Sequence, residues 1–314
     1  MRVLALLAEC NYDAGADGWS VEDFLVKVVV IPPPPSPGSW TPPIGIPMPP
    51  FGIDETHMMY EDPANRNPLL TYITGPDGPY THYVDKTKTN CSDTGNGTAA
   101  VPRCTIPTSL TEGSVVEVHG GIYTPAQVIN GTGTVTRPIF VRGANATTRP
   151  EIRIRWQVNG AYMIFEHLLM TQGIDESGIE AHFESHHISI RHSEFSGLGN
   201  DLGNGSIVRA SGTNPANPVR FVVMYNNYIH NIGDSSVTAP QNDMIGASVS
   251  RNSRDVWILD NHIHNMGADA VQLKETAWVY VGRNELHHDG ENAIDIKGEI
   301  SINHVIVSQN KMYG

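Results

Sequence analysis

The chain has 314 residues and a formal net charge of −13, and it is rich in glycine (30) and proline (22) but poor in aromatic residues (7%). The acidic balance argues against a general nucleic-acid binder, because such domains carry basic faces. No apolar run approaches the roughly 18 residues of a membrane-spanning helix. The composition instead favours many short strands joined by tight turns over long helices.

The N-terminal region contains the stretch IPPPPSPGSWTPPIGIPMPP at residues 31–50. Proline lacks a backbone N–H donor and favours the polyproline II conformation. We therefore expect residues 1–50 to form a Pro-rich arm or linker that is poorly ordered. Residues 51–112 carry turn signals such as TGPDGPY and DTGNGT and are expected to form an irregular cap region. The opening MRVLALLAEC is a poor signal peptide, because its apolar run is short.

Two of the three cysteines, Cys91 and Cys104, lie in the polar stretch NCSDTGNGTAAVPRCTIP. They can close a short disulfide loop, and the alternative is two free thiols. Disulfides persist in oxidising compartments, so a bridge here favours a secreted, extracellular or cell-surface protein.

From Gly113 the chain becomes a series of short alternating strands separated by glycines. A unit then recurs that consists of an apolar strand, a turn residue and a second short strand. The turn residues are spaced by 26, 34, 34, 23 and 26 residues: His167, Ser193, Asn227, Asn261, Asn284 and Asn310. A repeat of this length without a helical period indicates a stacked solenoid. The rival leucine-rich repeat requires a leucine spacing that is absent.

The rungs NAIDIK and NHVIVSQNKMYG, and the opening GSVVEVHGG with RPIFVRGAN, resemble those of pectate-lyase-like proteins over residues 113–314. The resemblance implies an all-β fold, a right-handed parallel β-helix (solenoid) that follows the irregular Pro-rich N-terminal segment. The residues Asn226/Asn227, Asn261, Asn284 and Asn310 match the asparagine ladder of such folds. Asparagine suits this turn because it tolerates the left-handed conformation and its amide can bond to the next rung.

The sequence ends at Gly314, directly after a rung. The end of a solenoid exposes strand edges and normally needs a cap. We therefore expect either a truncated sequence or a partner that covers this rung, with self-association through the last rung as one form of it. The non-enzymatic alternative is a structural or adhesive solenoid subunit that self-assembles.

The strands AVQLK and AIDIK place alternate residues on opposite faces, because strand side chains alternate. The expected inward residues are Val271, Leu273, Ile294 and Ile296, and the expected outward residues are Gln272, Lys274, Asp295 and Lys297. Lys274 is thus expected above Lys297, and earlier coils put Arg251 and Arg209 near the same column, beside Glu180 and His182. This basic column predicts a groove for an anionic polymer such as a polyuronate. The alternative is a solvated face whose lysines pair with Asp295 and Glu275.

In the lyases among pectate-lyase-like proteins, a lysine or arginine removes the C5 proton of a uronate while Ca²⁺ or another cation neutralises the carboxylate. The resemblance therefore implies a polysaccharide lyase acting by β-elimination on an acidic, uronate-containing polysaccharide. It makes Lys274 the base, with Arg251 and Lys297 as its cationic partners. The expected substrate contacts are Gln272, Arg209, His182 and His230. The expected Ca²⁺ ligands, which supply the oxygen atoms that calcium prefers, are Asp269, Asp295 and Glu291.

Three turn units contain the phrase Asn-x-apolar-His, which should stack His230, His264 and His287 on the third strand of successive coils. Such a column can bind Zn²⁺ or supply a general acid or base, which makes His264 and His287 further catalytic candidates. The alternative is a recurrent surface phrase in which each histidine bonds into the next turn.

A glycoside hydrolase is the main enzymatic alternative, because it needs two or three carboxylates on neighbouring rungs. The available acids are Asp269, Asp289, Glu291 and Asp295, but the tight Asp-Asp pair of the polygalacturonase type is absent. A C5 epimerase would use almost the same site as a lyase.

Overall fold

The computed structural model describes residues 40–57, 63–75, 78–124, 127–153, 155–171, 178–197, 205–233, 244–298 and 302–314. This part of the chain is all-β except for one short 3₁₀ helix, η1 (Pro63–Asn65). No helix in it is long and apolar enough to cross a membrane. The strands β1 (Ile73–Gly75) and β2 (Gly78–Tyr80) form a small antiparallel hairpin.

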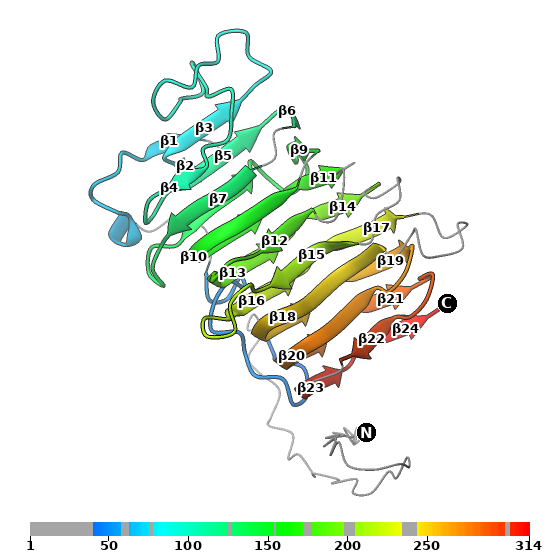
Figure 1. Ribbon diagram of the computed structural model, residues 1–314. Helices are drawn as coiled ribbons and strands as arrows, with labels where there is room; N and C mark the ends of the chain where they lie inside the picture. The colour runs from blue at the N-terminus through cyan, green and yellow to red at the C-terminus, as the bar shows by residue number, and fades with distance from the viewer. Residues whose placement is uncertain are drawn as a thin grey trace, which may run out of the picture.

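All other strands belong to two parallel sheets (Figure 1). Within the described residues the larger sheet has 14 strands: β3 (His82–Asp85), β4 (Ser109–Leu110), β5 (Val115–His119), β7 (Gln127–Thr132), β8 (Ile139–Gly143), β10 (Trp156–Glu166), β12 (Ile179–Ala181), β13 (His186–Arg191), β15 (Gly205–Ser211), β16 (Val219–Tyr225), β18 (Met244–Leu259), β20 (Val271–Gly282), β22 (Ile294–Lys297) and β23 (Asn303–Ser308). The smaller has eight: β6 (Gly121–Tyr123), β9 (Glu151–Ile152), β11 (Leu169–Thr171), β14 (Glu194–Ser196), β17 (Tyr228–Ile232), β19 (His262–Met266), β21 (Glu285–His287) and β24 (Lys311–Tyr313).

The chain alternates between these sheets, and each strand pairs in parallel with the equivalent strand of the next repeat. The long strands β18 and β20 belong to two surfaces, because the first part of β18 pairs with β15 and its second part with β16. We call the outer surface of β7, β12, β15, β22 and the first parts of β10, β18 and β20 the first face. The second parts of the long strands, with β13, β16 and β23, form the second face, and the smaller sheet forms the third face.

Parallel pairing reaches further towards the N-terminus than expected. The strand β3 already pairs with β5, in the register His82 to Val116, so the stack begins before the predicted boundary at residue 113. Cys91 and Cys104 lie in this region and form the predicted disulfide. The loop that it closes follows β3 directly.

The main core runs the length of the stack and consists of inward-facing aliphatic residues. Ile229 pairs with Ile263, and Ile263 with Leu286, and all three are buried. Val271 and Leu273 are fully buried, as their alternation predicts, whereas Ile294 is half-buried and Ile296 is 48% exposed. Stacking like on like lets each rung bury its neighbour's apolar surface, which is the dominant favourable contribution to folding.

The asparagine ladder is present and buried. The Nδ2 atom of Asn261 donates to Oδ1 of Asn284 (3.0 Å) and to the carbonyl of Met224 (2.8 Å), and the Asn261 N–H donates to the same Oδ1 (2.9 Å). Asn227 makes the same bonds to Asn261, and Asn284 makes them to Asn310. Each amide thus satisfies backbone groups that a buried turn would otherwise leave without partners.

Of the asparagines expected in the left-handed conformation, Asn226 takes it, whereas the ladder residues Asn227, Asn261, Asn284 and Asn310 do not. The residue before each ladder position takes it, with φ between 50° and 57°: His167, His192, Asn226, Asp260, Arg283 and Gln309. His167 therefore belongs to this left-handed column, and Leu168 occupies the ladder position, where its N–H donates to Ser193 Oγ (3.2 Å). The ladder residue needs an extended backbone to direct its amide along the stack.

Residues 40–57 cross the second face (the blue segment in Figure 1). Phe51 and Ile53 are fully buried, and the carbonyl of Pro47 accepts a hydrogen bond from Nε1 of Trp257 (2.9 Å). Prolines lack donors, but their rings pack and their carbonyls accept. Residues 40–50 are therefore packed against the sheet, in contrast to the poor order expected for the Pro-rich arm, while residues 1–39 lie outside the described residues.

Candidate functional site

Two columns of outward side chains run along the first face, and the strand pairing fixes their members. One column stacks Gln157, Glu180, Arg209, Ser248, Gln272 and Asp295. The second stacks Ser211, Ser250, Lys274 and Lys297. Corresponding residues on neighbouring strands lie about 4.8 Å apart, so each column presents a continuous line of polar groups.

The prediction that Lys274 lies over Lys297 is confirmed by the pairing of β20 with β22. Both lysines are exposed, but their surroundings differ. Lys297 Nζ forms an ion pair with Asp295 Oδ2 at 2.6 Å. Lys274 has no ion pair with any carboxylate among the described residues. The solvated-face alternative therefore describes Lys297, whereas Lys274 is an unneutralised cation.

Arg251 does not belong to the basic column, and that expectation is wrong. The register of β18 against β20 shifts between Ser250 and Ser253, where β18 carries one more residue than its partner. Arg251 and Asn252 take left-handed conformations at this bulge (φ 41° and 50°), and Ser250 stands next to Lys274 instead. A bulge re-aims the side chains that follow it, which places Arg251 at the corner of the sheet.

Arg209 belongs by register to the column that contains Glu180, but its side chain reaches the column that contains Lys274. Its Nη2 atom donates to Ser250 Oγ at 3.4 Å, and Ser250 is the residue paired with Lys274. Its Nε atom lies 3.6 Å from Glu180 Oε1. Arg209 thus reaches the serine that is paired with Lys274, a position that was expected of Arg251.

Glu180 is buried at the centre of this group, and the sequence signal for its role was weak. Arg155 Nη2 pairs with Glu180 Oε2 at 2.7 Å, and His182 Nδ1 lies 3.2 Å from Oε1 and 2.9 Å from the carbonyl of Ser211. His182 is therefore held beside the predicted substrate surface. Arg155 was not predicted as a site residue, because only the strand pairing shows that it faces a glutamate 25 residues later.

The carboxylates expected to bind calcium are not gathered into a ready site. Asp269 is fully buried and accepts hydrogen bonds from Gln272 Nε2 (3.1 Å) and Asn292 Nδ2 (2.9 Å). Gln272 is buried with it rather than open to substrate, while Asp295 is paired with Lys297 and Glu291 is exposed. Burial raises the pKa of Asp269. No group of three convergent metal-ligand side chains in the described residues includes any of these acids.

Asp289 is an acid whose environment the sequence did not reveal. Its carboxylate oxygens are buried, and the main-chain bond from Gly290 N–H to the Met266 carbonyl places it at the corner between the third and first faces. Burial raises the pKa of Asp289 to about 7; the main chain of Met266 opposes this rise, and the carboxylate of Asp269 adds a smaller contribution to it.

The predicted histidine column exists on the third face, away from Lys274. His230, His264 and His287 occupy one register position of β17, β19 and β21, and the rings of His264 and His287 are stacked with centroids 4.7 Å apart. His230 Nε2 lies 3.2 Å from Glu194 Oε1, so this histidine pairs with a glutamate and does not contribute to the first face. The structure therefore does not bring His264 and His287 together with the lysines.

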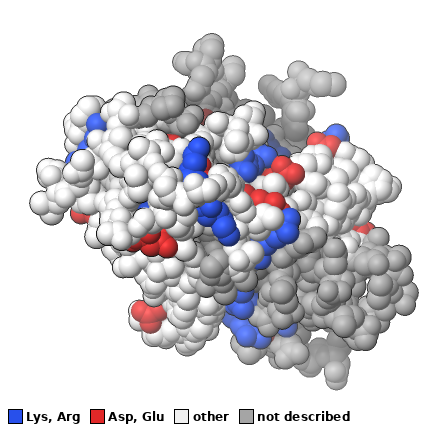
Figure 2. All heavy atoms as spheres, turned by 90° about the horizontal axis from the view of Figure 1, so that it is seen from above, with Lys and Arg blue, Asp and Glu red and all other residues white. Residues whose placement is uncertain are grey.

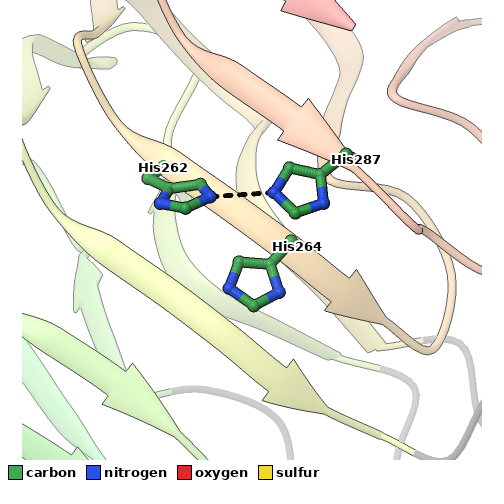
Figure 3. Close-up of side chains that lie close together, drawn as sticks. All are labelled: His262, His264 and His287. Carbon is green, nitrogen blue, oxygen red and sulfur yellow. Dashed lines mark hydrogen bonds between the residues drawn. The ribbon is translucent and has the colours of Figure 1, made fainter. Parts of the chain in front are cut away.

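His262 belongs to the same cluster, and only the alternation of the His-Ile-His sequence pointed to it. Its Nε2 atom lies 2.8 Å from His287 Nε2, and its ring faces those of His264 and His287 (Figure 3). Burial is the main cause that lowers the pKa of His264 to about 4, and the neighbouring histidines lower it further. This imidazole is therefore neutral at physiological pH.

Charges of opposite sign are interspersed on the molecular surface. Figure 2 shows Lys and Arg side chains lying next to Asp and Glu side chains on the face that it presents. On this surface Lys274 is a cation that no carboxylate of the described residues neutralises.

Comparisons with known proteins find similarity at low identity. No protein-family model matches the sequence, and no curated protein matches it. Among solved structures, the pectate lyase Pel9A is similar with a TM-score of 0.47 and 15% identity over 67% of this chain, which spans 54% of that protein. An alginate lyase from Paenibacillus sp. str. FPU-7 has a TM-score of 0.37 and 15% identity over 64% of this chain and 89% of its own.

A mannuronic acid specific family 6 lyase from human gut microbiota is similar with a TM-score of 0.26 and 11% identity, over 65% of this chain and 77% of its own. The structural neighbours are thus pectate and alginate lyases, the class of protein that the sequence resembles.

Proposed function

We propose that the protein is a right-handed parallel β-helix, a solenoid, that acts on an acidic, uronate-containing polysaccharide as a β-eliminating lyase. The observation that carries the proposal is Lys274, an exposed cation without a carboxylate partner among the described residues. Stacked like charges repel, so an unneutralised lysine beside Lys297 costs free energy in the free protein. An anionic substrate removes this cost when it binds.

The residues around Lys274 support a division of labour in the elimination. Lys274 would first lose its ammonium proton to solvent. Its Nζ atom would then take the C5 proton of the uronate, and the C4–O glycosidic bond would break as the C4–C5 double bond forms. The departing oxygen takes up a proton, from the new ammonium group or from solvent. Lys297 and Arg209 would bind the uronate carboxylate and stabilise the negative charge that develops on it.

Calcium remains a separate prediction. Asp269, Asp295 and Glu291 do not converge in the described chain, and the proposed elimination does not require the ion. Lys297 is the present partner of Asp295. A calcium site at Asp295 would therefore need a substrate carboxylate as a further ligand.

Secretion is part of the proposal, and the Cys91–Cys104 disulfide supports it. Such bonds persist outside the reducing cytosol. A polysaccharide substrate is also expected outside the cell or at its surface.

The test is ultraviolet absorbance of the unsaturated uronate, on a panel of polyuronates and glycosaminoglycans, with calcium and with chelator. We expect a rise in absorbance that the Lys274→Met variant abolishes. Lys311→Met is the matched control, because Lys311 is an exposed lysine of the third face paired with Glu285. No rise on any substrate with folded protein, or full activity of Lys274→Met, would refute the proposal.

A hydrolase is the outcome that Asp289 favours, because a carboxyl group with a pKa of about 7 is suited to general-acid catalysis. Reducing ends released without ultraviolet absorbance, and lost in Asp289→Asn, would identify it. Both reactions release reducing ends, so the absorbance distinguishes them.

A further inference from the structure

The third face brings three imidazoles to one point. His262 and His264 are two residues apart on β19, so their side chains leave the same side of the strand. His287 lies on β21 in register with His264. One ligand atom from each of His262, His264 and His287 lies within 4.8 Å of the other two. Figure 3 shows the His264 ring lying beside the hydrogen-bonded pair of His262 and His287, and all three side chains are half-buried.

The donor set selects a particular class of ion. Imidazole nitrogen suits zinc, copper and nickel, whereas calcium and magnesium prefer oxygen ligands. The carboxylate of Glu285, on the same strand as His287, already binds Lys311 Nζ (2.9 Å) and the Tyr313 hydroxyl. Three histidines with a fourth position left for water is the ligand set of several catalytic zinc sites.

Neighbouring side chains hold the rings in these positions. The hydroxyl of Tyr228 lies 3.0 Å from Nε2 of His264, and the Tyr313 ring stacks on His287 with centroids 4.6 Å apart. His287 Nδ1 lies 2.6 Å from His288 Nδ1. Outer partners of this kind orient metal-binding histidines and fix which nitrogen faces the ion.

Little movement is needed to admit an ion. The Nε2 atoms of His262 and His287 are now 2.8 Å apart and share a hydrogen bond. Two nitrogen ligands of a tetrahedral zinc ion lie about 3.3 Å apart, as its bond lengths of about 2.0–2.1 Å require. The metal would therefore replace the shared proton once the His262 and His287 rings part slightly. The His264 ring, now stacked on that of His287 with centroids 4.7 Å apart, would turn in place until one of its nitrogens faces the ion.

We propose that His262, His264 and His287 bind one Zn²⁺ ion, or another divalent transition-metal ion that prefers imidazole, and so join strands β19 and β21 of successive coils. The site lies on the third face and uses none of the residues assigned to the lyase reaction. Three protein ligands would leave a fourth position for water. The proposal therefore stands or falls independently of polysaccharide cleavage.

The first test is a zinc titration of tag-free, chelator-stripped full-length protein against a chromophoric zinc chelator. We expect one zinc ion per chain, and affinity at least ~100-fold weaker in His264→Gln and in His287→Gln, because each removes a ligand. His304→Gln is the matched control, since His304 is an exposed histidine of the second face that stacks on Trp278. It should bind zinc like the wild type.

A second measurement needs no variant. Co²⁺ bound by three imidazoles and water in tetrahedral geometry gives strong visible absorption bands, and zinc should raise the Tm of the wild type, because an ion that binds only the folded state stabilises it. Absence of stoichiometric zinc binding and of these bands overturns the proposal. So does zinc affinity that is unchanged in folded His264→Gln, or reduced equally in His304→Gln.

Discussion

Lys274 of β20 lies directly over Lys297 of β22, and of these two lysines only Lys297 has a carboxylate partner within the described chain. The two residues occupy equivalent positions of successive coils, and the ion pair with Asp295 distinguishes Lys297 from Lys274. Substituting them separately should therefore distinguish a base from a residue that binds charge.

We expect Lys274→Met to lower kcat by about 10²–10⁴-fold, the usual contribution of a positioned general base. Lys297→Met should mainly raise KM, since Lys297 would bind the uronate carboxylate. Both residues are exposed, so neither change should alter the free energy of unfolding by more than about 0.5 kcal/mol. Steady-state kinetics on the cleaved polyuronate, with urea unfolding of each variant, would check this; equal effects on KM alone would exclude Lys274 as the base.

The asparagine ladder should contribute strongly to stability. Asn261→Ala would remove the acceptor of the Asn227 N–H and Nδ2 groups and the donor to the Met224 carbonyl, all of them buried. We expect a loss of about 3 kcal/mol, because unsatisfied buried polar groups cost about 1–3 kcal/mol each. The control is Asn159→Ala, an exposed asparagine that bonds only to Asn130 among the described residues. Urea unfolding should separate the two variants, and equal midpoints would contradict the ladder's role.

Glu166 should make stability depend on acid pH. It is buried between Arg191 Nη2 (2.7 Å) and Arg142 Nε (3.1 Å). Burial by itself would raise the pKa of Glu166, but Arg191 and Arg142 together lower it below the ordinary 4.5. The stabilisation is therefore complete above about pH 4.5 and is lost as the pH falls through the lower folded-state pKa.

The matching variant is Glu166→Gln, which removes the carboxylate that two buried arginines share, while the ion pair of Arg191 Nη1 with Asp54 Oδ1 (3.4 Å) remains. We expect it to be less stable by about 3–5 kcal/mol at pH 7, as is usual when one partner of a buried ion pair is removed. Below pH 4.5 its stability should fall less steeply than that of the wild type. Urea midpoints measured from pH 3 to 7 would show whether the two curves converge, and parallel curves would disprove the assignment.

Residues 40–57 should behave as part of the folded core. Phe51 is fully buried, and its ring packs edge-on against Tyr162 with centroids 5.5 Å apart. We expect Phe51→Ala to destabilise the protein by about 3–5 kcal/mol, the usual cost of such a truncation. Met48 is 44% exposed, so Met48→Ala should cost less than about 0.5 kcal/mol. Thermal unfolding compares the pair, and a small effect of Phe51→Ala would mean that the segment is dispensable.

Much of the stack could be predicted because its signals are local. Asn261 and Asn284 recur at a spacing that only a repeat explains, and AVQLK aligns with AIDIK without an insertion, so the Lys274–Lys297 contact followed from alternation. The disulfide followed from two cysteines in one polar loop.

The remainder depends on contacts that one repeat does not encode. The bulge at Arg251 and Asn252 adds a residue to one strand and shifts the register, which removed Arg251 from the column. The packing of Pro47 on Trp257 joins residues 210 positions apart, and no local pattern announces it. The alternation of His-Ile-His could have predicted the place of His262 in the histidine cluster. The recurrent Asn-x-apolar-His phrase selects His264 of this strand and not His262.

The left-handed column beside the ladder has a consequence for how such a protein can diversify. Its members carry imidazole, amide, carboxylate and guanidinium groups in turn, and none is β-branched: His167, His192, Asn226, Asp260, Arg283 and Gln309. The buried amides next to them supply the hydrogen bonds of the corner, so the fold does not depend on which unbranched side chain stands there. The surface chemistry of one coil can thus change during evolution while the interior stays constant.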